Sequence, residues 1–332
     1  MNFSKNQKGS LLILVLFSLI FLSLLALSVG YAVRQKMDGV RRLEARENLR
    51  LAAEAAVQQA SLLLLEKGEG SYSALNQPWA NNASLWKSAH IGAVDLSILA
   101  RGKKGAADAL YGLTDEDRKI NLNHGSPRAL QLIFENVAHV EKEDARRIVS
   151  AIRDWVDEDE DLNEGGAESQ DYLSRNPAYG AKNGLFNDLQ ELLWIQGMTP
   201  EIFSKVKHFL TLDASSVNVN TASQEVLIAM GLNSNIASKI IQYRAGKDDQ
   251  EGTADDGVFK SLDEIADVLS RTIYLNEADL KNLEYVLSQG FSVNSSFFNA
   301  EIDAQVNHRQ SIKVNAILDD KGKVQRWHED FF

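Results

Sequence analysis

The amino-acid sequence predicts an α+β protein in which a long N-terminal α-helix packs on an antiparallel β-sheet, with a large helical domain inserted between the strands. An uncharged apolar run from Ser10 to Val33 continues without a proline into an amphipathic helical pattern that ends near residue 67. Strand-like alternation occurs before residue 124 and again after residue 290. The pattern between these regions is helical, which indicates an insertion into one sheet.

These patterns divide the chain into five expected segments. They are a leader at 1–9, the membrane-spanning half of the N-terminal helix at 10–33, the first part of the sheet domain at 34–124, an inserted α domain at 125–289, and the C-terminal strands of the sheet domain at 290–332.

The apolar run is long enough to cross a bilayer. From Leu11 to Val29 it holds no ionisable side chain, and as a helix it spans roughly 28 Å, close to the thickness of the hydrocarbon core. Lys5 and Lys8 precede the run, so the positive-inside rule keeps the N-terminus in the cytoplasm and sends the rest of the chain outward. We expect a protein that crosses the membrane once and has most of its chain on the outer side.

Three interpretations of this N-terminus compete. A cleaved secretory signal has about 7–15 apolar residues followed by a small-x-small site, whereas this run is longer and has no obvious A-x-A break. An uncleaved signal anchor is the second interpretation. The third is a leader of the kind found on pilins, cut on the cytoplasmic side between Gly9 and Ser10. It accounts for the lysines, the glycine and the immediate start of the apolar run.

Composition limits the possible functions of the outer part. The 332 residues carry a net charge of −11, which disfavours binding to nucleic acid. Cysteine is absent, so no disulfide holds the fold. The six histidines are scattered and no G-x-S-x-G motif occurs. We therefore predict a protein that is not an enzyme.

The second half of the N-terminal helix carries an apolar stripe. We expect this half to lie on a globular domain, and the stripe between Leu43 and Leu65 to pack on partner helices. The loop from Ser71 to Ser88 that follows is polar, and we expect its Trp79 and Trp86 to be exposed. The stripe consists of Leu43, Leu49, Ala53, Ala56, Val57, Ala60 and Leu64.

Four segments alternate as strands do. Two precede the helical block, Ile91–Ala100 and Leu110–Asn123, and two follow it, Gly290–Val306 and Ser311–Asp319. A turn at Asp320-Lys321-Gly322-Lys323 then leads into a last strand at the C-terminus.

The helical block contains an internal repeat. Ile120-Asn121-Leu122-Asn123 recurs 97 positions later as Val217-Asn218-Val219-Asn220, and each copy is followed by a capped helix. A Phe-x-x-Leu-x-Glu element follows each, at Phe186 and at Phe259. We interpret the asparagines as structural, because their side chains bond local backbone at such turns. We expect Trp155 and Trp194 to be core residues.

The second repeat resembles the helix-hairpin-helix segments of DNA-binding competence receptors, which gives a rival function. Such modules bind phosphate through backbone N–H groups of a Gly-hydrophobic-Gly hairpin. Here the hairpins read Gly231-Leu232-Asn233 and Asn136-Val137-Ala138, so one or both glycines are missing. The surroundings are acidic, and we expect the fold element without a phosphate site.

Two acidic loops are candidate metal sites. In the first, Asp157, Asp159 and Asp161 alternate and Glu168 stands twelfth, as in an EF-hand, although Leu162 occupies the glycine position. Oxygen ligands without Cys or clustered His select Ca²⁺. On the residues alone, a solvated acidic surface is favoured over a metal site for the first loop, because most runs of charged residues are solvated surface. The candidate ligands are Asp157, Asp159, Asp161, Glu164, Glu168, Asp171, Asp248, Asp249, Asp255 and Asp256.

An ordered set of short motifs resembles the K-type minor pseudopilins of bacterial type II secretion systems, and the resemblance covers essentially the whole chain. The motifs are Lys8-Gly9, INLN, Asp154-Trp155-Val156-Asp157, Gly165-Gly166-Ala167-Glu168 with Asp171-Tyr172, Gly184-Leu185-Phe186, Glu191-Leu192-Leu193, Gly197-Met198-Thr199-Pro200 and VNVNTA.

The resemblance implies a pilin-like fold and a tip role that nucleates or caps the pseudopilus for protein export. It implies I- and J-type minor pseudopilins and other pseudopilins as partners, with secreted substrates or the outer-membrane secretin as further contacts. It also implies a prepilin peptidase that cuts before Ser10, methylation of the new N-terminus, and up to two calcium ions in the α domain. The alternatives are the membrane-anchored DNA receptor and a minor pilin of a type IV pilus.

One departure from the pilin pattern supports this class. Most pilins carry Glu at the fifth mature position, where it pairs with a neighbour's N-terminal amine, whereas here the fifth residue after Gly9 is Leu14. A tip subunit has no subunit above it to supply the amine, and a buried carboxylate without a partner is costly.

Overall fold

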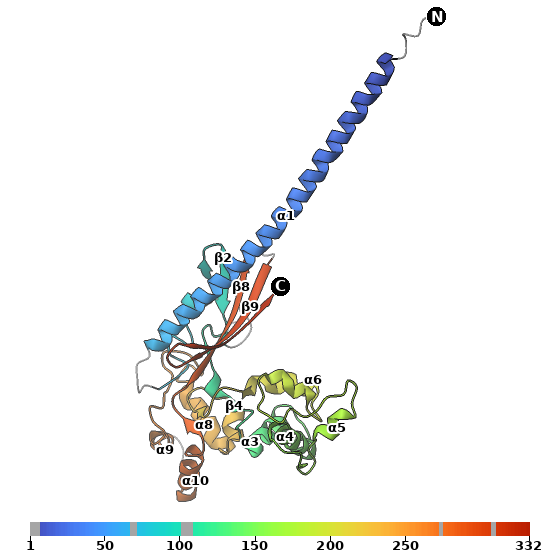
Figure 1. The fold of residues 1–332 in the computed structure, drawn as a ribbon. Helices are drawn as coiled ribbons and strands as arrows, with labels where there is room; N and C mark the ends of the chain where they lie inside the picture. The colour runs from blue at the N-terminus through green and yellow to red at the C-terminus, as the bar shows by residue number, and fades with distance from the viewer. Residues whose placement is uncertain (1–6, 67–71, 101–108, 272–274, 307–309) are drawn as a thin grey trace, which may run out of the picture.

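A computed structural model describes residues 7–66, 72–100, 109–271, 275–306 and 310–332. Most of the predicted leader, residues 1–6, lies outside these ranges. The molecule consists of one long helix that runs out from a sheet, and a helical domain at the opposite end of the sheet (Figure 1). This is the predicted α+β architecture.

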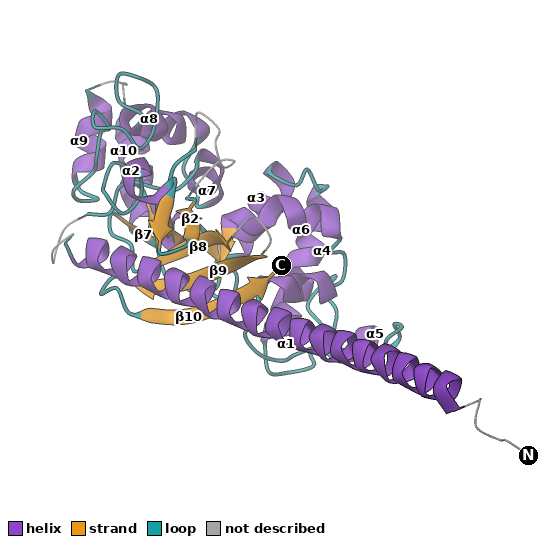
Figure 2. Ribbon diagram, turned by 90° about the horizontal axis from the view of Figure 1, so that it is seen from above, coloured by secondary structure: helices purple, strands orange, loops and turns teal. Residues whose placement is uncertain are grey.

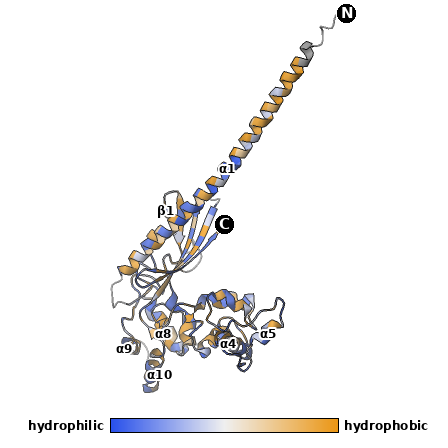
Figure 3. Cartoon of the chain, in the orientation of Figure 1, coloured by the Kyte–Doolittle hydropathy of each residue, from blue (hydrophilic) through white to orange (hydrophobic). Residues whose placement is uncertain are grey.

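Helix α1, Gln7–Leu65, has 59 residues and a length of about 88 Å at the α-helical rise. Its N-terminal half is apolar and stands clear of the rest of the chain (Figure 3). Among the described helices, it alone is long and apolar enough to cross a membrane. Its C-terminal half lies along the sheet (Figure 2).

The sheet has the order β1-β2-β8-β9-β10, and every neighbouring pair in it is antiparallel. A further strand, β3, pairs with β8. The helical domain is inserted between β3 and β8, as predicted. The strands are β1 Ala89–Ile91, β2 Val94–Ile98, β3 Thr114–Asp115, β8 Phe297–Val306, β9 Gln310–Asp319 and β10 Val324–Phe331.

One face of this sheet is covered by α1. Alternate residues of β8 and β9, such as Ile302 and Val314, are buried there. Ala53 and Ala56 on α1 are small, which lets the helix approach the sheet closely. The turn between β9 and β10 also meets α1: Gly322 has φ +72°, and a Cβ there would lie 2.1 Å from the Ser61 hydroxyl oxygen. The sequence therefore needs glycine at this point.

The predicted use of the apolar stripe is wrong. Most of the stripe, from Leu49 to Leu64, is buried against this chain's own sheet, so it does not offer a face to partner helices. Leu43 lies before the sheet begins and is exposed. The pattern identified the buried face correctly, but helical periodicity does not say what covers that face.

Two further expectations about single elements are wrong. Residues 110–123 are not one strand, because Asp115 accepts a hydrogen bond from the Asp117 N–H (2.8 Å) and turns the chain into the short 3₁₀ helix η1, Glu116–Arg118. Trp79 and Trp86 are not exposed: each is only 1% accessible, and Trp79 packs edge-on against Phe298. Trp86 ends the short helix α2, Ala83–Trp86.

The tryptophans of the helical block behave differently from one another. Trp155 is buried, as expected, and contacts Tyr172 edge-on at a centroid distance of 5.4 Å. Trp194 is 47% exposed, so its placement in the core was wrong.

The inserted domain is built from two copies of one unit, each bracketed by a short parallel strand pair. Helices α3 and α7 pack against each other and join the copies. The first copy holds β4 Ile120–Asn121, α3 Pro127–Asn136, α4 Lys142–Val156, α5 Ser169–Leu173, η2 Leu189–Trp194, α6 Pro200–Val206, η3 Lys207–Phe209 and β5 Leu210–Thr211. The second holds β6 Val217–Asn218, α7 Gln224–Ala229, α8 Ser234–Arg244, α9 Glu264–Ser270, α10 Glu277–Leu287 and β7 Phe291–Ser292.

Two hydrophobic clusters correspond to the two domains. One extends from Ile120 to Phe291, so the boundaries expected at 125 and 289 lie a few residues inside it. The other combines residues from Leu49 to Leu113 with residues from Phe298 to Leu318.

The repeat extends to individual hydrogen bonds, which confirms the structural interpretation of the asparagines. In the first copy Asn123 accepts from the Phe186 N–H (2.8 Å) and donates to the Phe186 carbonyl (3.2 Å). In the second copy Asn220 accepts from the Phe259 N–H (2.9 Å) and donates to the Phe259 carbonyl (2.8 Å). Each asparagine thus pins its Phe-x-x-Leu-x-Glu element to the start of its own unit.

Replacing Asn220 by alanine is expected to lower the free energy of unfolding by about 2–3 kcal/mol, because the buried N–H and C=O of Phe259 would lose their hydrogen-bond partner. Urea denaturation of the full chain in detergent measures the loss. The control is Asn187→Ala, at an exposed position, which should change stability by less than about 0.5 kcal/mol. An Asn220→Ala protein as stable as this control would contradict the structural role.

Candidate metal centre

The first acidic loop, residues 157–168, leaves the end of α4 and is folded back over it by Asp154. This carboxylate is fully buried and accepts three hydrogen bonds, from the Asn163 N–H (3.2 Å), the Asn163 side-chain amide (2.5 Å) and the Ala167 N–H (2.7 Å). Gly166 is required at this crossing, because a Cβ there would lie 1.9 Å from Asp154 Oδ2. Contacts within the protein therefore give this loop its shape without a bound ion.

Three carboxylates converge inside this loop. One oxygen each from Asp157, Asp159 and Glu168 lies within 4.8 Å of the others. Glu168 is only 5% exposed, and neither of its carboxylate oxygens has a hydrogen-bond partner. Asp157 Oδ1 is also buried without a partner. Buried carboxylate oxygens without donors are costly unless a cation completes them.

Asn183 lies in the same neighbourhood, although it was not among the predicted ligands. Its side-chain amide donates to the Asp159 carbonyl (3.4 Å) and to Glu160 Oε1 (3.0 Å). Its Oδ1 is buried and has no partner. Asn183 adopts a left-handed conformation with φ 49° just before Gly184, and an Asn-Gly pair typical of a tight turn was the available signal.

The electrostatics favour a bound cation. Burial and, to a smaller extent, the charges of Asp154 and Asp157 together raise the pKa of Glu168 to about 7. Burial, Asp159 and Asp154 also raise the pKa of Asp157. Oxygen ligands of this kind suit Ca²⁺, which tolerates irregular coordination by carboxylates and carbonyls. The residues present thus fit one hard divalent cation.

The other predicted ligands of this loop lie outside the cluster. Asp161 is exposed, and its N–H donates to Asp159 Oδ1 (2.9 Å). Glu164 is exposed and faces Arg146 at 3.6 Å. Asp171 accepts a hydrogen bond from the Glu168 N–H (3.0 Å) at the start of α5. The EF-hand spacing therefore brings together its positions 1, 3 and 12 but not position 5.

The second acidic loop, residues 246–259, has a different arrangement. Asp248, Asp255 and Asp256 each accept hydrogen bonds from N–H groups of the loop itself. Asp249 is exposed and left-handed, with φ 55°. Across the described ranges, three carboxylates converge within 4.8 Å only in the first loop.

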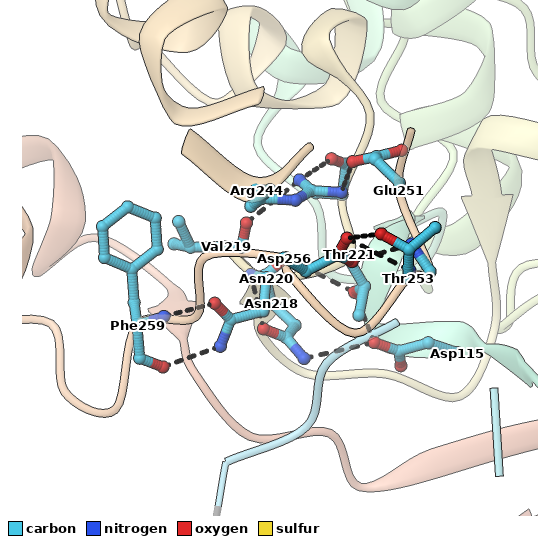
Figure 4. Close-up of polar contacts among 12 residues, drawn as sticks. Asp115, Asn218, Val219, Asn220, Thr221, Arg244, Glu251, Thr253, Asp256 and Phe259 are labelled. Atoms are coloured by element: carbon cyan, nitrogen blue, oxygen red, sulfur yellow. Dashed lines mark hydrogen bonds and ion pairs between the residues drawn. The ribbon is translucent and has the colours of Figure 1, made fainter. Parts of the chain in front are cut away.

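A third acidic group, Asp115-Glu116-Asp117, lies buried where the sheet domain meets the inserted domain. Asp115 accepts hydrogen bonds from the Ser295 hydroxyl (2.6 Å), the Asn218 amide (3.2 Å) and the Thr221 hydroxyl (Figure 4). Glu116 contacts Lys119 (2.5 Å) and accepts from the Thr211 hydroxyl (2.7 Å). These acids serve as structural acceptors between the domains, a role the sequence analysis missed.

Asp117 makes the stability of this junction depend on pH. Burial and, to a smaller extent, the charge of Asp115 together raise its pKa from 3.8 to about 8. Between these values the folded chain holds a proton that the unfolded chain has released, so stability falls as pH rises from about 4 to about 8 and then levels off. Asp117→Asn has no such proton, and we expect its unfolding free energy to fall less over this range.

Urea titrations of both proteins at pH 5 and pH 8.5 measure this difference. Asp330→Asn, at a largely exposed position, is the control and should follow the unchanged chain. Equal pH slopes for Asp117→Asn and the unchanged chain would contradict the assignment.

Residues 110–215 match the family model described as type II secretion system (T2SS), protein K. Curated proteins named type II secretion system protein K are similar over shorter stretches. The Dickeya chrysanthemi protein is 30% identical over 138 residues, 38% of each chain. The Klebsiella pneumoniae protein is 32% identical over 80 residues, 23% of this chain and 24% of that one. The Pectobacterium carotovorum protein is 27% identical over 100 residues, 29% of this chain and 30% of that one.

These alignments therefore span between about a quarter and two fifths of the relatives' length. A solved structure shares the fold over a much longer stretch. It is a chain from the GspK-GspI-GspJ complex of the enterotoxigenic Escherichia coli type 2 secretion system, with a TM-score of 0.66 and 19% identity, covering 87% of this chain and 98% of that chain. Residues 110–215 of this chain are therefore similar in sequence to protein K of type II secretion systems, and 87% of the chain shares the fold of the solved structure.

Proposed function

We propose that this chain is a minor pseudopilin that occupies the tip of the pseudopilus and nucleates or caps its assembly for protein export. The observation that carries the proposal is the shape of the molecule: an apolar half-helix stands free, and a broad helical domain lies at the far end of the sheet (Figures 1 and 3). The chain has no catalytic task in this role.

The free half of α1 supports a cycle between membrane and fibre. Large apolar side chains from Leu11 to Val33 are about half exposed or more, so this segment needs either lipid or a bundle of similar helices around it. The N-terminus would lie in the cytoplasm and the rest in the periplasm. A prepilin peptidase would cut between Gly9 and Ser10, and the new N-terminus would be methylated.

The tip position has two supports. The inserted domain sits beyond the sheet, opposite the N-terminus of α1, where it obstructs the addition of another subunit (Figure 1). Leu14, the fifth residue after the proposed cut, offers no carboxylate to the amine of a subunit above it. The partners below would be the I- and J-type minor pseudopilins. The inserted domain would face secreted substrates or the outer-membrane secretin.

A calcium ion in the first acidic loop completes this proposal. Asp157, Asp159 and Glu168 would hold it, with Asn183 beside them. The ion would neutralise clustered charge and rigidify a loop that no disulfide holds.

The rival function, DNA binding by the helix-hairpin-helix units, lacks a phosphate site. Helix α4 begins with Glu143 and Asp144 in its first turn, which repel a phosphate at the helix N-terminus. The first hairpin lies at His139-Val140-Glu141 and not at the predicted Asn136-Val137-Ala138, because α3 continues to Asn136 and α4 is capped by Glu141. His139, with φ 58°, stands where such modules use glycine. A gel shift of the full chain in detergent at physiological salt tests the rival, and tight DNA binding would favour it.

The tip role is tested by coexpressing the chain with I- and J-type pseudopilins and labelling assembled fibres with an antibody against the inserted domain. We expect copurification of all three proteins and label at one end of each fibre. Label along the whole fibre, as for a type IV pilus subunit, would overturn the tip role. N-terminal sequencing should find a methylated Ser10, and an intact Met1 would contradict the proposed processing.

A further inference from the structure

The two acidic loops differ in whether their carboxylate oxygens already accept hydrogen bonds, and therefore in how well they could bind a cation. In the first, both oxygens of Glu168, and Asp157 Oδ1, are without donors. In the second, donors already occupy both oxygens of two carboxylates, Asp255 and Asp256. Both oxygens of Asp256 accept N–H bonds, from Gly252 (2.7 Å) and Thr253 (3.1 Å). Both oxygens of Asp255 accept as well, from the Lys247 N–H (2.7 Å) and the Thr253 hydroxyl (2.8 Å).

Donor hydrogens aimed at an oxygen occupy the lone pairs that a metal would use. To bind an ion through Asp255 and Asp256, the second loop would have to break hydrogen bonds that give it its shape. Gly246 packs closely on Asp255, since a Cβ there would lie 2.7 Å from the Asp255 carbonyl oxygen. The second loop in this conformation does not fit a metal ion.

A positively charged side chain of the protein lies at this loop instead. Arg244, at the end of α8, is only 2% exposed. Its guanidinium donates to the carbonyls of Val219 (3.1 Å) and Ala222 (2.5 Å) and pairs with Glu251 of the loop (Figure 4). A buried guanidinium is always charged and holds several acceptors in fixed directions. Arg244 therefore joins the loop to the first turn of its repeat.

The residue after Glu251 reaches the sheet domain. The Gly252 carbonyl accepts a hydrogen bond from the Asn81 amide (2.8 Å), 171 positions earlier in the chain. Gly252 has φ +90°, and a Cβ there would approach Leu110 Cδ2 at 3.2 Å. The second loop thus lies directly on the sheet domain, at the point where Arg244 holds it.

We propose that Arg244 is the resident cation of the second acidic loop. This loop takes no metal ion and serves as a strap that fastens the second repeat to the sheet domain. The first repeat, in contrast, has its loop held by calcium, and this half of the contrast rests on the proposed function. One chain then binds one ion, and its removal loosens the first loop but not the strap.

Calorimetric titration of the full chain in detergent with calcium alone tests the stoichiometry. We expect one ion per chain, one ion for Asp255→Asn and for Asp256→Asn, and none for Asp157→Asn. Two ions in the unchanged chain, or a loss of binding in Asp255→Asn or Asp256→Asn, would overturn the proposal. No binding at all would contradict the first-loop site, and the test of the strap below would then decide the proposal alone.

Hydrogen exchange, read by mass spectrometry with calcium and with a chelator, tests the strap. Residues 246–259 should keep the same protection in both conditions, and Arg244→Met should raise their exchange at least tenfold in both. Lys239→Met, on the exposed side of α8, is the matched control and should change nothing. Arg244→Lys keeps the charge and loses the fork geometry, so it should give an intermediate increase. Protection of 246–259 that depends on calcium, or that survives in Arg244→Met, would overturn the proposal.

Discussion

Replacing Glu168 by glutamine is expected to abolish the calcium-dependent rise in melting temperature while leaving the ion-free protein folded. Glu168 contributes two buried oxygens without donors, and its amide counterpart binds a hard cation much less well. At free calcium about 100 times the dissociation constant, the ion stabilises the chain by about 2.7 kcal/mol, which corresponds to roughly 5 °C. Thermal scans with calcium and with a chelator measure the difference.

The matched control is Glu164→Gln in the same loop. Glu164 is exposed and lies outside the cluster, so this variant should keep the full calcium response. Asp157→Asn should lose the response as Glu168→Gln does. A response that disappears in Glu164→Gln, or persists in Glu168→Gln, would refute the assignment of ligands.

The same carboxylate predicts how calcium affinity depends on pH. The pKa of Glu168 is raised to about 7, so a proton competes with the ion below that pH, and affinity should fall from pH 8 to pH 6. Without calcium the sign reverses for stability. The folded chain holds a proton that the unfolded chain releases, so stability is lost as pH rises through about 7. Glu168→Gln should remove both dependences.

Replacing Asp115 by alanine is expected to lower the free energy of unfolding by about 3–5 kcal/mol, because the buried donors of Ser295, Asn218 and Thr221 would lose their common acceptor. These donors come from the second repeat and from the chain just before β8, so the loss should separate the two domains first. Urea denaturation followed by tryptophan fluorescence measures it, since Trp79 reports on one domain and Trp155 on the other.

Asp330→Ala is the control for this change, because it removes a carboxylate from a largely exposed position of β10. It should alter stability by less than about 0.5 kcal/mol. The interdomain role of Asp115 would be wrong if Asp115→Ala unfolded in one transition at the same urea concentration as Asp330→Ala.

Much of the fold could be predicted because it rests on local periodicity. The long helix, the flanking strands and the duplicated unit all follow from spacing along the chain. The recurrence of Asn123 and Asn220 was visible in the sequence, but their bonds to Phe186 and Phe259 were not predicted, because these partners lie 63 and 39 positions further along the chain. The burial of Trp79 and the exposure of Trp194 could not be predicted. Whether an aromatic side chain in a loop or at a helix end is buried depends on segments far away in the sequence.

The candidate metal site was predicted in part for a related reason. Asp157, Asp159 and Glu168 share one loop, and their spacing was visible. Asn183 reaches the cluster from beyond α5, so only the folded chain places it there. The two acidic loops looked alike as sequences, because both are rich in aspartate and glycine.

The sequence by itself determined where the chain is apolar, where it repeats and where its charge is concentrated, since these properties depend on residue type and spacing alone. Only the tertiary structure decided how the carboxylates of each acidic loop are paired. The first loop keeps carboxylate oxygens without hydrogen-bond donors, whereas the carboxylates of the second loop pair with N–H groups of the loop itself and with Arg244. The physical reason is that a carboxylate's partners are set by backbone direction and by distant side chains. Two loops of similar acidity therefore fold differently: one keeps buried carboxylate oxygens without donors, and the other forms an internal salt bridge.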